Sequence, residues 1–211
     1  MSRQDRLPDV ALADAVRRVA RVVRVSTVSP TERDRAIALL DEATAILGQE
    51  ETPGPYWLTG FSSFEEFDLT TPLEDLHTYS PAVGDANPFA PQVDLEVTED
   101  KVVQGTVRFT EIHNGPPWNT CHGGILALVY DDIVGLAAMV GAGGGMTVRL
   151  TVNYRKPTPL FEPIRFRAWL EEHEGRKFLA RGEMHHGEVL LSEAEGLFVR
   201  PNGFPPGTSV G

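Results

Sequence analysis

The chain has 211 residues, and its 30 acidic and 19 basic side chains give a formal net charge of -11 when histidine is neutral. This length suits one ordinary domain with an extension and allows a sizeable core. The acidic surplus argues against non-specific binding of nucleic acid. The single cysteine excludes an intrachain disulfide and fits a reducing compartment.

The N-terminal segment carries no targeting signal that we recognise. The first 25 residues lack the apolar stretch of a signal peptide, and their aspartates disfavour a transit peptide despite six arginines. Further along, Asp131 and Asp132 interrupt the longest apolar run, which argues against a transmembrane helix. We therefore expect a cytoplasmic protein without membrane contact.

Residues 1–52 predict a helical extension. Apolar side chains recur at helical spacing over 9–25, and arginines align on another face. Such a basic helix could recruit a membrane or an acidic partner, but we expect a packed helix with a solvated arginine face. A second helix is predicted from Ser29-Pro-Thr-Glu32, with serine as N-cap, to a stop at Gly48. The residues behind these patterns are Val10, Ala13, Val16, Ala20 and Val23, then Arg17, Arg21 and Arg24, then Ile37, Leu40, Thr44 and Leu47.

Residues 53–90 are rich in Pro, Gly, Ser and Thr but also in aromatic side chains. Because so much aromatic surface is unfavourable in water, we expect this segment to wrap across the domain as irregular structure and to cover one end of a substrate channel.

Residues 91–200 indicate two strands, one helix and four more strands, followed by a tail over 201–211. Apolar and polar residues alternate in the strands, which is typical of half-buried antiparallel strands. The apolar face of such a sheet needs a cover, and the all-apolar helix after Gly124 is the available candidate. This pattern predicts an α+β domain. The alternation is clearest over 103–109, 148–154, 164–170 and 178–184, and a last strand covers 189–199.

The most informative motif is His122-Gly123-Gly124, followed by Asp131 and Asp132 within that apolar helix. A buried carboxylate is costly unless it is paired, hydrogen-bonded or used. Backbone N–H groups at the start of a helix lack intrahelical partners, so a carbonyl oxygen arriving there would be polarised. The alternative interpretation is a simple turn followed by the exposed edge of a surface helix.

Several motifs together resemble the hotdog-fold thioesterases, and most closely the PaaI-type and THEM-type acyl-CoA thioesterases. The resemblance covers roughly 79–199. It implies a hotdog fold, in which an antiparallel sheet wraps around one long central helix. It also implies hydrolysis of acyl-CoA, with medium- to long-chain fatty acyl groups suggested by the THEM-type enzymes and aromatic acyl groups left open. The motifs are His122-Gly-Gly-x6-Asp131, Gly145-Met-Thr147, Asn153-Tyr-Arg-Lys-Pro157, Glu174-Gly-Arg-Lys177 and Leu191-Ser-Glu-Ala-Glu-Gly-Leu-Phe198, with Asn87-Pro-Phe-Ala-Pro91 leading into the first strand.

The resemblance also implies the catalytic residues. Asp131 would attack the thioester or activate a water, and Thr147 would assist it from across a dimer interface. The N–H of Gly123, helped by Gly124, would polarise the carbonyl, and His122 would line the site. Either Asn114 or Asn119 would contact the carbonyl or the water.

Substrate binding would use the basic pairs Arg155-Lys156 and Arg176-Lys177 for the anionic end of coenzyme A, although each pair could equally be solvated charge. The acyl group would run beside Leu126, Tyr130 and Val134. We expect no metal and no cofactor apart from the coenzyme A of the substrate. The resemblance implies a homodimer, or a dimer of dimers, with sites at the subunit interface and a role in fatty acid metabolism.

Other interpretations stay open. The same fold supports acyl-CoA hydratases or dehydratases, but these usually pair Asp with His, and no histidine follows Asp131 in the helix. A catalytically silent acyl-CoA binding module is a third possibility. Asp132 points about 100° away from Asp131, so we expect it to pair or to cap instead of acting on substrate. We interpret Cys121 as a small buried residue and His185-His186 as part of a hairpin.

Overall fold

The computed structural model describes residues 3–50, 77–116 and 119–202, with side chains from residue 9 onward. Most of the predicted wrapping segment lies outside these ranges. The helices are α1 (Arg3–Val25), α2 (Pro30–Leu47), the short 3-10 helix η2 (Glu111–His113) and α5 (Gly123–Ala142). The strands are β1 (Gln92–Val97), β2 (Val103–Arg108), β3 (Asn114–Gly115), β4 (Thr120–Cys121), β5 (Met146–Tyr154), β6 (Pro163–Glu174), β7 (Lys177–His186) and β8 (Val189–Val199).

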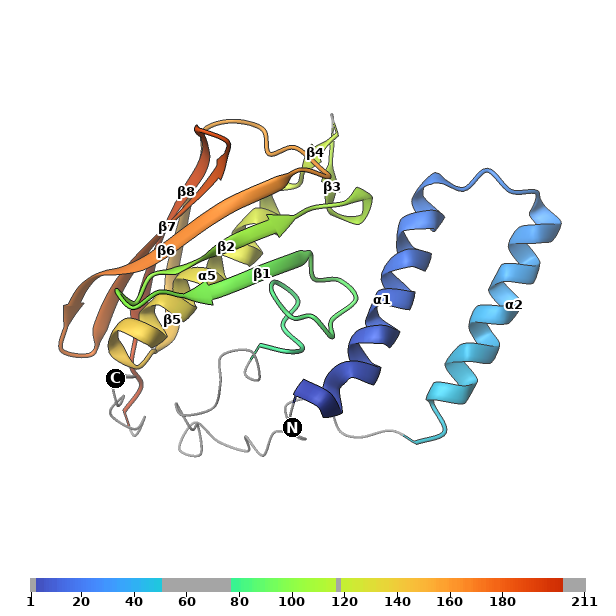
Figure 1. Cartoon of the computed structure of the whole chain (residues 1–211), viewed down its shortest axis with the longest axis horizontal. Helices are drawn as coiled ribbons and strands as arrows, with labels where there is room; N and C mark the ends of the chain where they lie inside the picture. The colour runs from blue at the N-terminus through green and yellow to red at the C-terminus, as the bar shows by residue number, and fades with distance from the viewer. Residues whose placement is uncertain (1–2, 51–76, 117–118, 203–211) are drawn as a thin grey trace.

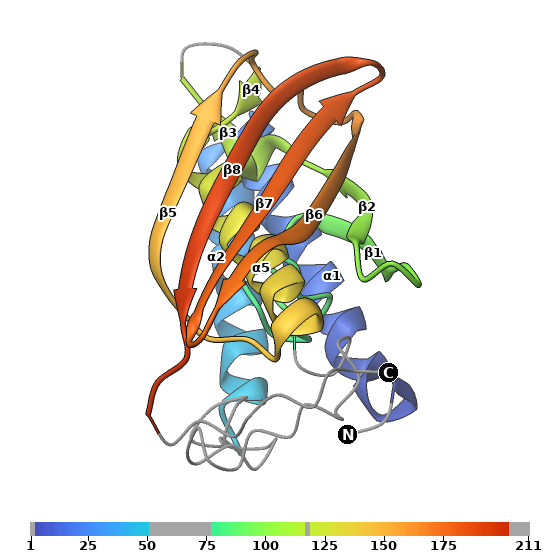
Figure 2. The ribbon, with the colours of Figure 1, turned by 90° about the vertical axis from the view of Figure 1, so that its left-hand side faces the viewer.

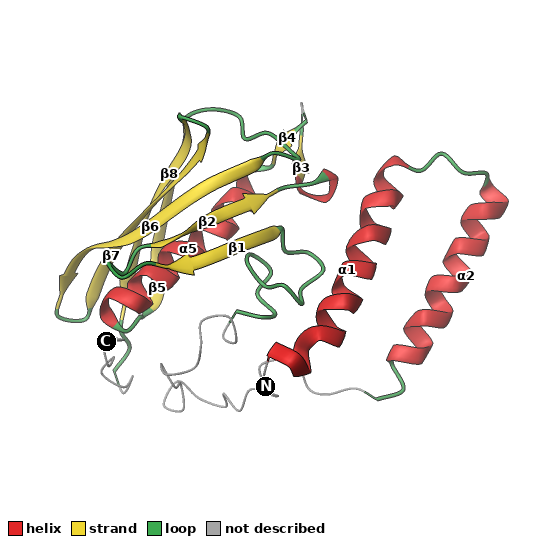
Figure 3. Ribbon diagram, viewed as in Figure 1, coloured by secondary structure: helices red, strands yellow, loops and turns green. Residues whose placement is uncertain are grey.

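Six strands form one antiparallel sheet in the order β1-β2-β6-β7-β8-β5. The sheet curves around α5, which lies in its concave face (Figure 2). This arrangement confirms the predicted α+β hotdog fold with helices at its N-terminus (Figure 3). The small β3-β4 hairpin just before α5 was not anticipated, because strands of two residues leave no periodic pattern.

The core lies between α5 and the sheet. Tyr130, Ile133 and Val134 are fully buried, and each fully buried aliphatic side chain contributes roughly 1.5–3 kcal/mol. Two strand glycines make room for the helix, since a Cβ added at Gly182 or Gly196 would lie 3.0 Å or less from a Val134 methyl group. By length and composition α5 could also cross a membrane, but here it is the helix on which the sheet packs.

This packing corrects one prediction. Tyr130 and Val134 face the sheet instead of lining an acyl tunnel. The Tyr130 hydroxyl lies 2.9 Å from the equally buried Ser192 hydroxyl, so the polar end of this large side chain is paired within the core.

The N-terminal helices project beyond β1 and η2 as a hairpin (Figure 1). The expected solvated arginine face is wrong for Arg17, which docks α1 onto the domain. Its guanidinium binds Asp14 at 2.6 Å and donates to the carbonyl oxygens of residues 84, 85 and 87. The turns over 77–90 leave these carbonyls without strand partners, and arginine supplies the donors. Of the predicted apolar stripe, Ala13 is buried but Val16 and Val23 are exposed.

Ser29 caps α2 as predicted, because its hydroxyl accepts a hydrogen bond from the Glu32 N–H at 3.3 Å. Pro30 stands at the first helical position and Gly48 at the C-cap. No residue of α2 is buried, so this helix is held to the described part of the chain through α1 and the connecting turn.

Candidate active site

The start of α5 presents one free backbone donor. His122 is the N-cap, and its Nδ1 accepts from the Gly124 N–H at 2.9 Å. The N–H groups of Ile125 and Leu126 both donate to the His122 carbonyl. Among the described residues the N–H of Gly123 finds no acceptor. The helix start thus offers Gly123, and not Gly124, as the donor for an incoming carbonyl oxygen.

The same hydrogen bond determines the tautomer of the neutral His122 ring. Since Nδ1 accepts, the proton of the neutral imidazole resides on Nε2, which is free to donate to substrate. The ring is exposed beside the helix start.

The β3-β4 hairpin lies against His122. A Cβ at Gly115 would come within 2.8 Å of the His122 Cα, so only glycine fits this approach. Asn114 and Asn119 lie in and beside this hairpin, and their side chains face one another at 3.4 Å. Both predicted amides therefore stand near His122.

Asp131 lies on a face of α5 that is not packed in the core, and its side chain is half-buried. The Thr147 hydroxyl, at the start of β5, donates to Asp131 Oδ1 at 3.0 Å. The pair that sequence reasoning proposed is thus brought together, but within one chain and not across a dimer interface. The second carboxylate oxygen has no partner among the described residues and is available to a water or a carbonyl carbon.

Asp132 serves a different purpose. Its Oδ2 accepts a hydrogen bond from the buried Ser80 hydroxyl and lies 3.8 Å from His77 Nδ1. Ser80 also accepts from the Ala82 and Val83 N–H groups. Asp132 therefore ties the irregular segment before β1 to the middle of α5, which confirms the prediction that it pairs.

Tyr154, at the end of β5, is a site residue that sequence reasoning missed. Its hydroxyl donates to the Gly123 carbonyl at 2.7 Å, so it anchors the helix start from the edge strand. Partial desolvation raises the pKa of the Tyr154 hydroxyl, which favours the protonated form that donates. Only its place in the Asn153-Tyr154-Arg155 motif could have identified it.

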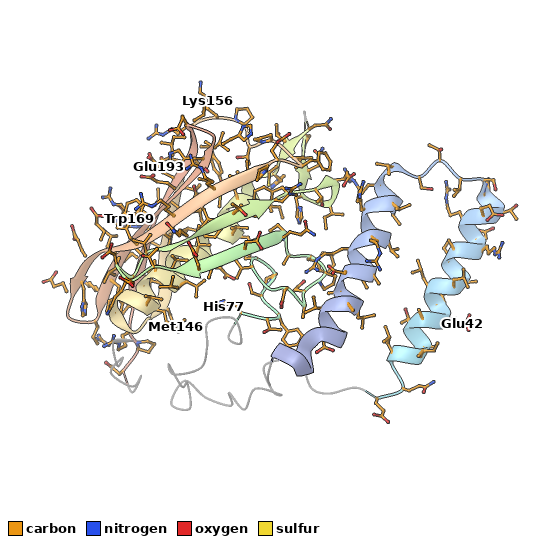
Figure 4. The ribbon with its side chains drawn as sticks, viewed as in Figure 1. Glu42, His77, Met146, Lys156, Trp169 and Glu193 are labelled. Atoms are coloured by element: carbon orange, nitrogen blue, oxygen red, sulfur yellow. The ribbon has the colours of Figure 1, made fainter. Side chains whose placement is uncertain are left out.

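A cavity of about 340 Å³ opens beside the helix start and includes Gly123, Leu126, Tyr154 and Lys156 in its lining. Lys156 has no ion-pair partner among the described residues and points outward at one end of the sheet (Figure 4). The neighbouring Arg155 binds Glu193. Of this predicted pair, Lys156 is the free cation.

The second basic pair lies elsewhere. Arg176 lies in the β6-β7 turn, and its side chain donates to Asn202 at 2.5 Å and to the Arg200 carbonyl. Lys177 pairs with Val199 at the C-terminal end of β8. Lys156 lies near the opposite end of β8, where its backbone N–H donates to the Leu191 carbonyl. The two predicted basic pairs therefore cannot contact one nucleotide within one chain.

Two other groups follow the plainer interpretation. Burial raises the pKa of the Cys121 thiol to about 12, so it is a poor nucleophile. His185 and His186 end β7 at the hairpin turn. Within 3–50, 77–116 and 119–202, no cluster of three His, Cys, Asp or Glu side chains could hold a metal.

The part of the chain that contains this site is similar to a known protein family. The thioesterase superfamily model matches residues 119–193. The acyl-coenzyme A thioesterase THEM4 of Xenopus laevis is 38% identical over 88 residues, which cover 41% of this chain and 39% of that protein. The Bos taurus protein of the same name is 37% identical over 81 residues, or 33% of its length. The chain thus matches well under half the length of these curated relatives.

Solved structures extend the similarity. The thioesterase superfamily protein RHA08564 is 30% identical and has a TM-score of 0.76, and the match covers 90% of each chain. A match of that extent reaches beyond the hotdog domain. The zebra fish thioesterase superfamily member 2 has a TM-score of 0.52 over 61% of this chain at 19% identity, which shows the shared fold alone.

Proposed function

The chain belongs to the thioesterase superfamily, and from this premise we propose that it hydrolyses acyl-CoA thioesters to a free acid and coenzyme A. The observation that carries the proposal is a free carbonyl-polarising N–H at Gly123 combined with a hydroxyl-paired carboxylate at Asp131. Thioester hydrolysis requires both groups, because one stabilises the oxyanion and the other supplies or activates the nucleophile.

In the proposed reaction the thioester carbonyl accepts a hydrogen bond from Gly123, with His122 Nε2 as a second donor. Asp131 removes a proton from a water that the Thr147 oxygen helps to hold, and the water oxygen adds to the carbonyl carbon. In the alternative route the Asp131 carboxylate adds to the carbonyl carbon itself, and a water later hydrolyses the resulting acyl–aspartate anhydride to the free acid. In both routes the carbonyl carbon–sulfur bond breaks after the addition, and the coenzyme A thiolate leaves with little acid assistance. The chemistry needs no cofactor beyond the coenzyme A of the substrate.

The spacing of these groups supports a site shared between two subunits. Gly123 and Asp131 are eight residues apart on one helix, which separates them by about 12 Å along its axis. Reacting atoms must approach to about 3–3.5 Å, so one carbonyl cannot use both groups of the same chain. A complete site therefore takes Asp131 and Thr147 from one protomer and the Gly123 donor from its partner.

The edge strand β5 offers the surface for this homodimer. It ends the sheet, and its nine residues include the exposed side chains of Met146, Val148 and Tyr154. A long exposed edge has unpaired N–H and C=O groups that a second copy can satisfy. Both Thr147 and Tyr154 lie on this strand, so pairing there brings two sites to the interface.

Coenzyme A would enter beside the helix start, where Lys156 can bind an anionic phosphate. Asn114 and Asn119 belong to the hairpin that packs against His122, and one of them would contact the carbonyl or a water. The THEM-type resemblance supports a medium- to long-chain acyl group. A hydratase or dehydratase gains no support, because α5 contains no histidine.

The test is thiol release from acyl-CoAs of graded length, together with phenylacetyl- and benzoyl-CoA. Turnover that is lost in Asp131→Asn and kept in Asp132→Asn supports the proposal, and the preferred chain length follows from the same panel. No turnover on any thioester would favour the binding-module interpretation.

A further inference from the structure

A second cavity, of about 400 Å³, lies between α1 and the hotdog domain. Its size falls within the range of about 300–1,000 Å³ that is typical of small-molecule sites. Four arginines contribute to its lining: Arg17, Arg18 and Arg21 from α1, and Arg108 from the end of β2. None of the residues assigned above to thioester hydrolysis lines this cavity.

The arginines carry more positive charge than their neighbours neutralise. Arg17 binds Asp14 at 2.6 Å, and Arg21 Nε binds Glu111 at 3.1 Å. The side chains of Arg18 and Arg108 make neither an ion pair nor a hydrogen bond with any described residue. Positive charges that lie close together without partners repel one another, and a bound anion would relieve this repulsion. The cluster is local, since the chain as a whole has a net charge of -11.

The histidine in the lining does not add to this charge. His113 Nδ1 accepts from the Thr110 N–H at 2.9 Å, and Nε2 lies 3.2 Å from the Phe89 carbonyl, so the neutral ring donates there. Burial, with the nearby Arg17 charge in support, lowers the pKa of His113. The anion would therefore meet guanidinium groups, whose planar fork suits phosphate oxygens.

One wall of the cavity is aromatic. Phe161 keeps 46% of its surface exposed and adopts a left-handed backbone conformation with φ of 68°. A bulky residue in this conformation is strained, and such strain gathers at ligand-binding positions. An exposed ring beside a cluster of arginines offers a stacking surface for a planar base.

We propose that this cavity between α1 and the domain binds a nucleotide, with its phosphates on Arg18 and Arg108 and its base against Phe161. Arg17 and Arg21 surround the phosphates while they hold α1 to the domain. The nucleotide is either free, such as ADP, or the nucleotide end of coenzyme A. This proposal does not depend on the proposed hydrolysis, because binding requires no turnover.

Calorimetric titration of the full chain with ADP, coenzyme A and inorganic phosphate tests the site. The double variant Arg18→Gln/Arg108→Gln loses two charge-assisted contacts, each of which accounts for about a tenfold change in affinity, so we expect about 100-fold weaker nucleotide binding. Arg33→Gln/Arg35→Gln, an equal charge change on exposed α2, should bind as wild type. Phe161→Leu should weaken ADP or coenzyme A binding while leaving phosphate binding unchanged.

The three probes also identify the source of the nucleotide. ADP binding that the double variant loses, without a matching loss for coenzyme A, identifies a free nucleotide; the reverse identifies the substrate's own nucleotide. Either result supports the site. If no probe binds saturably, or if the double variant binds each probe like wild type, the proposal is wrong. Thiol release measured in parallel reports separately on the proposed hydrolysis.

Discussion

Replacing Gly123 by proline removes the proposed oxyanion donor with little disturbance of the backbone. Proline is well tolerated at the first position of a helix, where the N–H has no intrahelical partner. The residue before a proline must be extended, and His122 already has φ of -66° and ψ of 134°. The perturbation therefore targets one hydrogen bond to substrate, and the fold should persist.

We expect a large loss of kcat, because the Gly123 N–H is the donor that is available to the substrate carbonyl. Gly124 is committed to His122 Nδ1 at 2.9 Å, so no neighbouring first-turn amide can take over. Removal of one oxyanion donor lowers kcat by about 100- to 1,000-fold, or roughly 2.7–4 kcal/mol.

Steady-state thiol release measures the effect, and a thermal melt verifies folding. Gly123→Ala retains the N–H and is the matched control, since its Cβ would lie 3.4 Å from the Tyr154 ring, in ordinary contact. We expect its kcat to stay within a few-fold of wild type. A folded Gly123→Pro enzyme with wild-type kcat would refute the role of this donor.

Three further predictions concern stability and the support of the site. Tyr130→Phe should leave the buried Ser192 hydroxyl without its partner and lower the free energy of unfolding by about 1–3 kcal/mol in urea denaturation. Adding Ser192→Ala should recover most of this loss. A double variant that remains equally destabilised would contradict the pairing. Because the pKa of Cys121 is raised to about 12 in the fold, the unfolded chain loses this proton first, and stability should fall as the pH rises above about 8.5. Cys121→Ala should flatten that fall in denaturation curves measured from pH 7 to pH 10, and an equally steep fall would exclude the thiol as its cause. Gly115→Ala must displace backbone, since its Cβ would lie 2.8 Å from the His122 Cα; we expect lower kcat in thiol-release assays, and unchanged kcat would show that the hairpin does not position His122.

Sequence patterns predicted the strands and the central helix of the domain well, because most strands bury one face and the helix is apolar all round; the hotdog fold itself was implied by the family resemblance. The alternation in β6 and β7 and the apolar run of α5 reflect local geometry that the fold preserves. The distinction between Asp131 and Asp132 was also readable, since adjacent helix positions point in different directions.

Long-range contacts were not readable. Arg17 looked like a solvated helix residue, but its partners are carbonyl oxygens about seventy positions away. Tyr130 and Val134 looked available to an acyl chain, whereas glycines on β7 and β8 admit them into the core. Thr147 was assigned to the opposite side of an interface because neither the path of β5 nor its hydrogen bond to Asp131 is encoded in local spacing.

We propose that one catalytic site joins Asp131 of one protomer to Gly123 of its partner. Co-expression of Asp131→Asn and Gly123→Pro chains with different affinity tags yields a purified mixed dimer for acyl-CoA hydrolysis assays. In a shared-site dimer both defects fall in one site and the other site is intact, so we predict about half of the wild-type turnover. Turnover no higher than that of the two single-variant dimers would contradict the account.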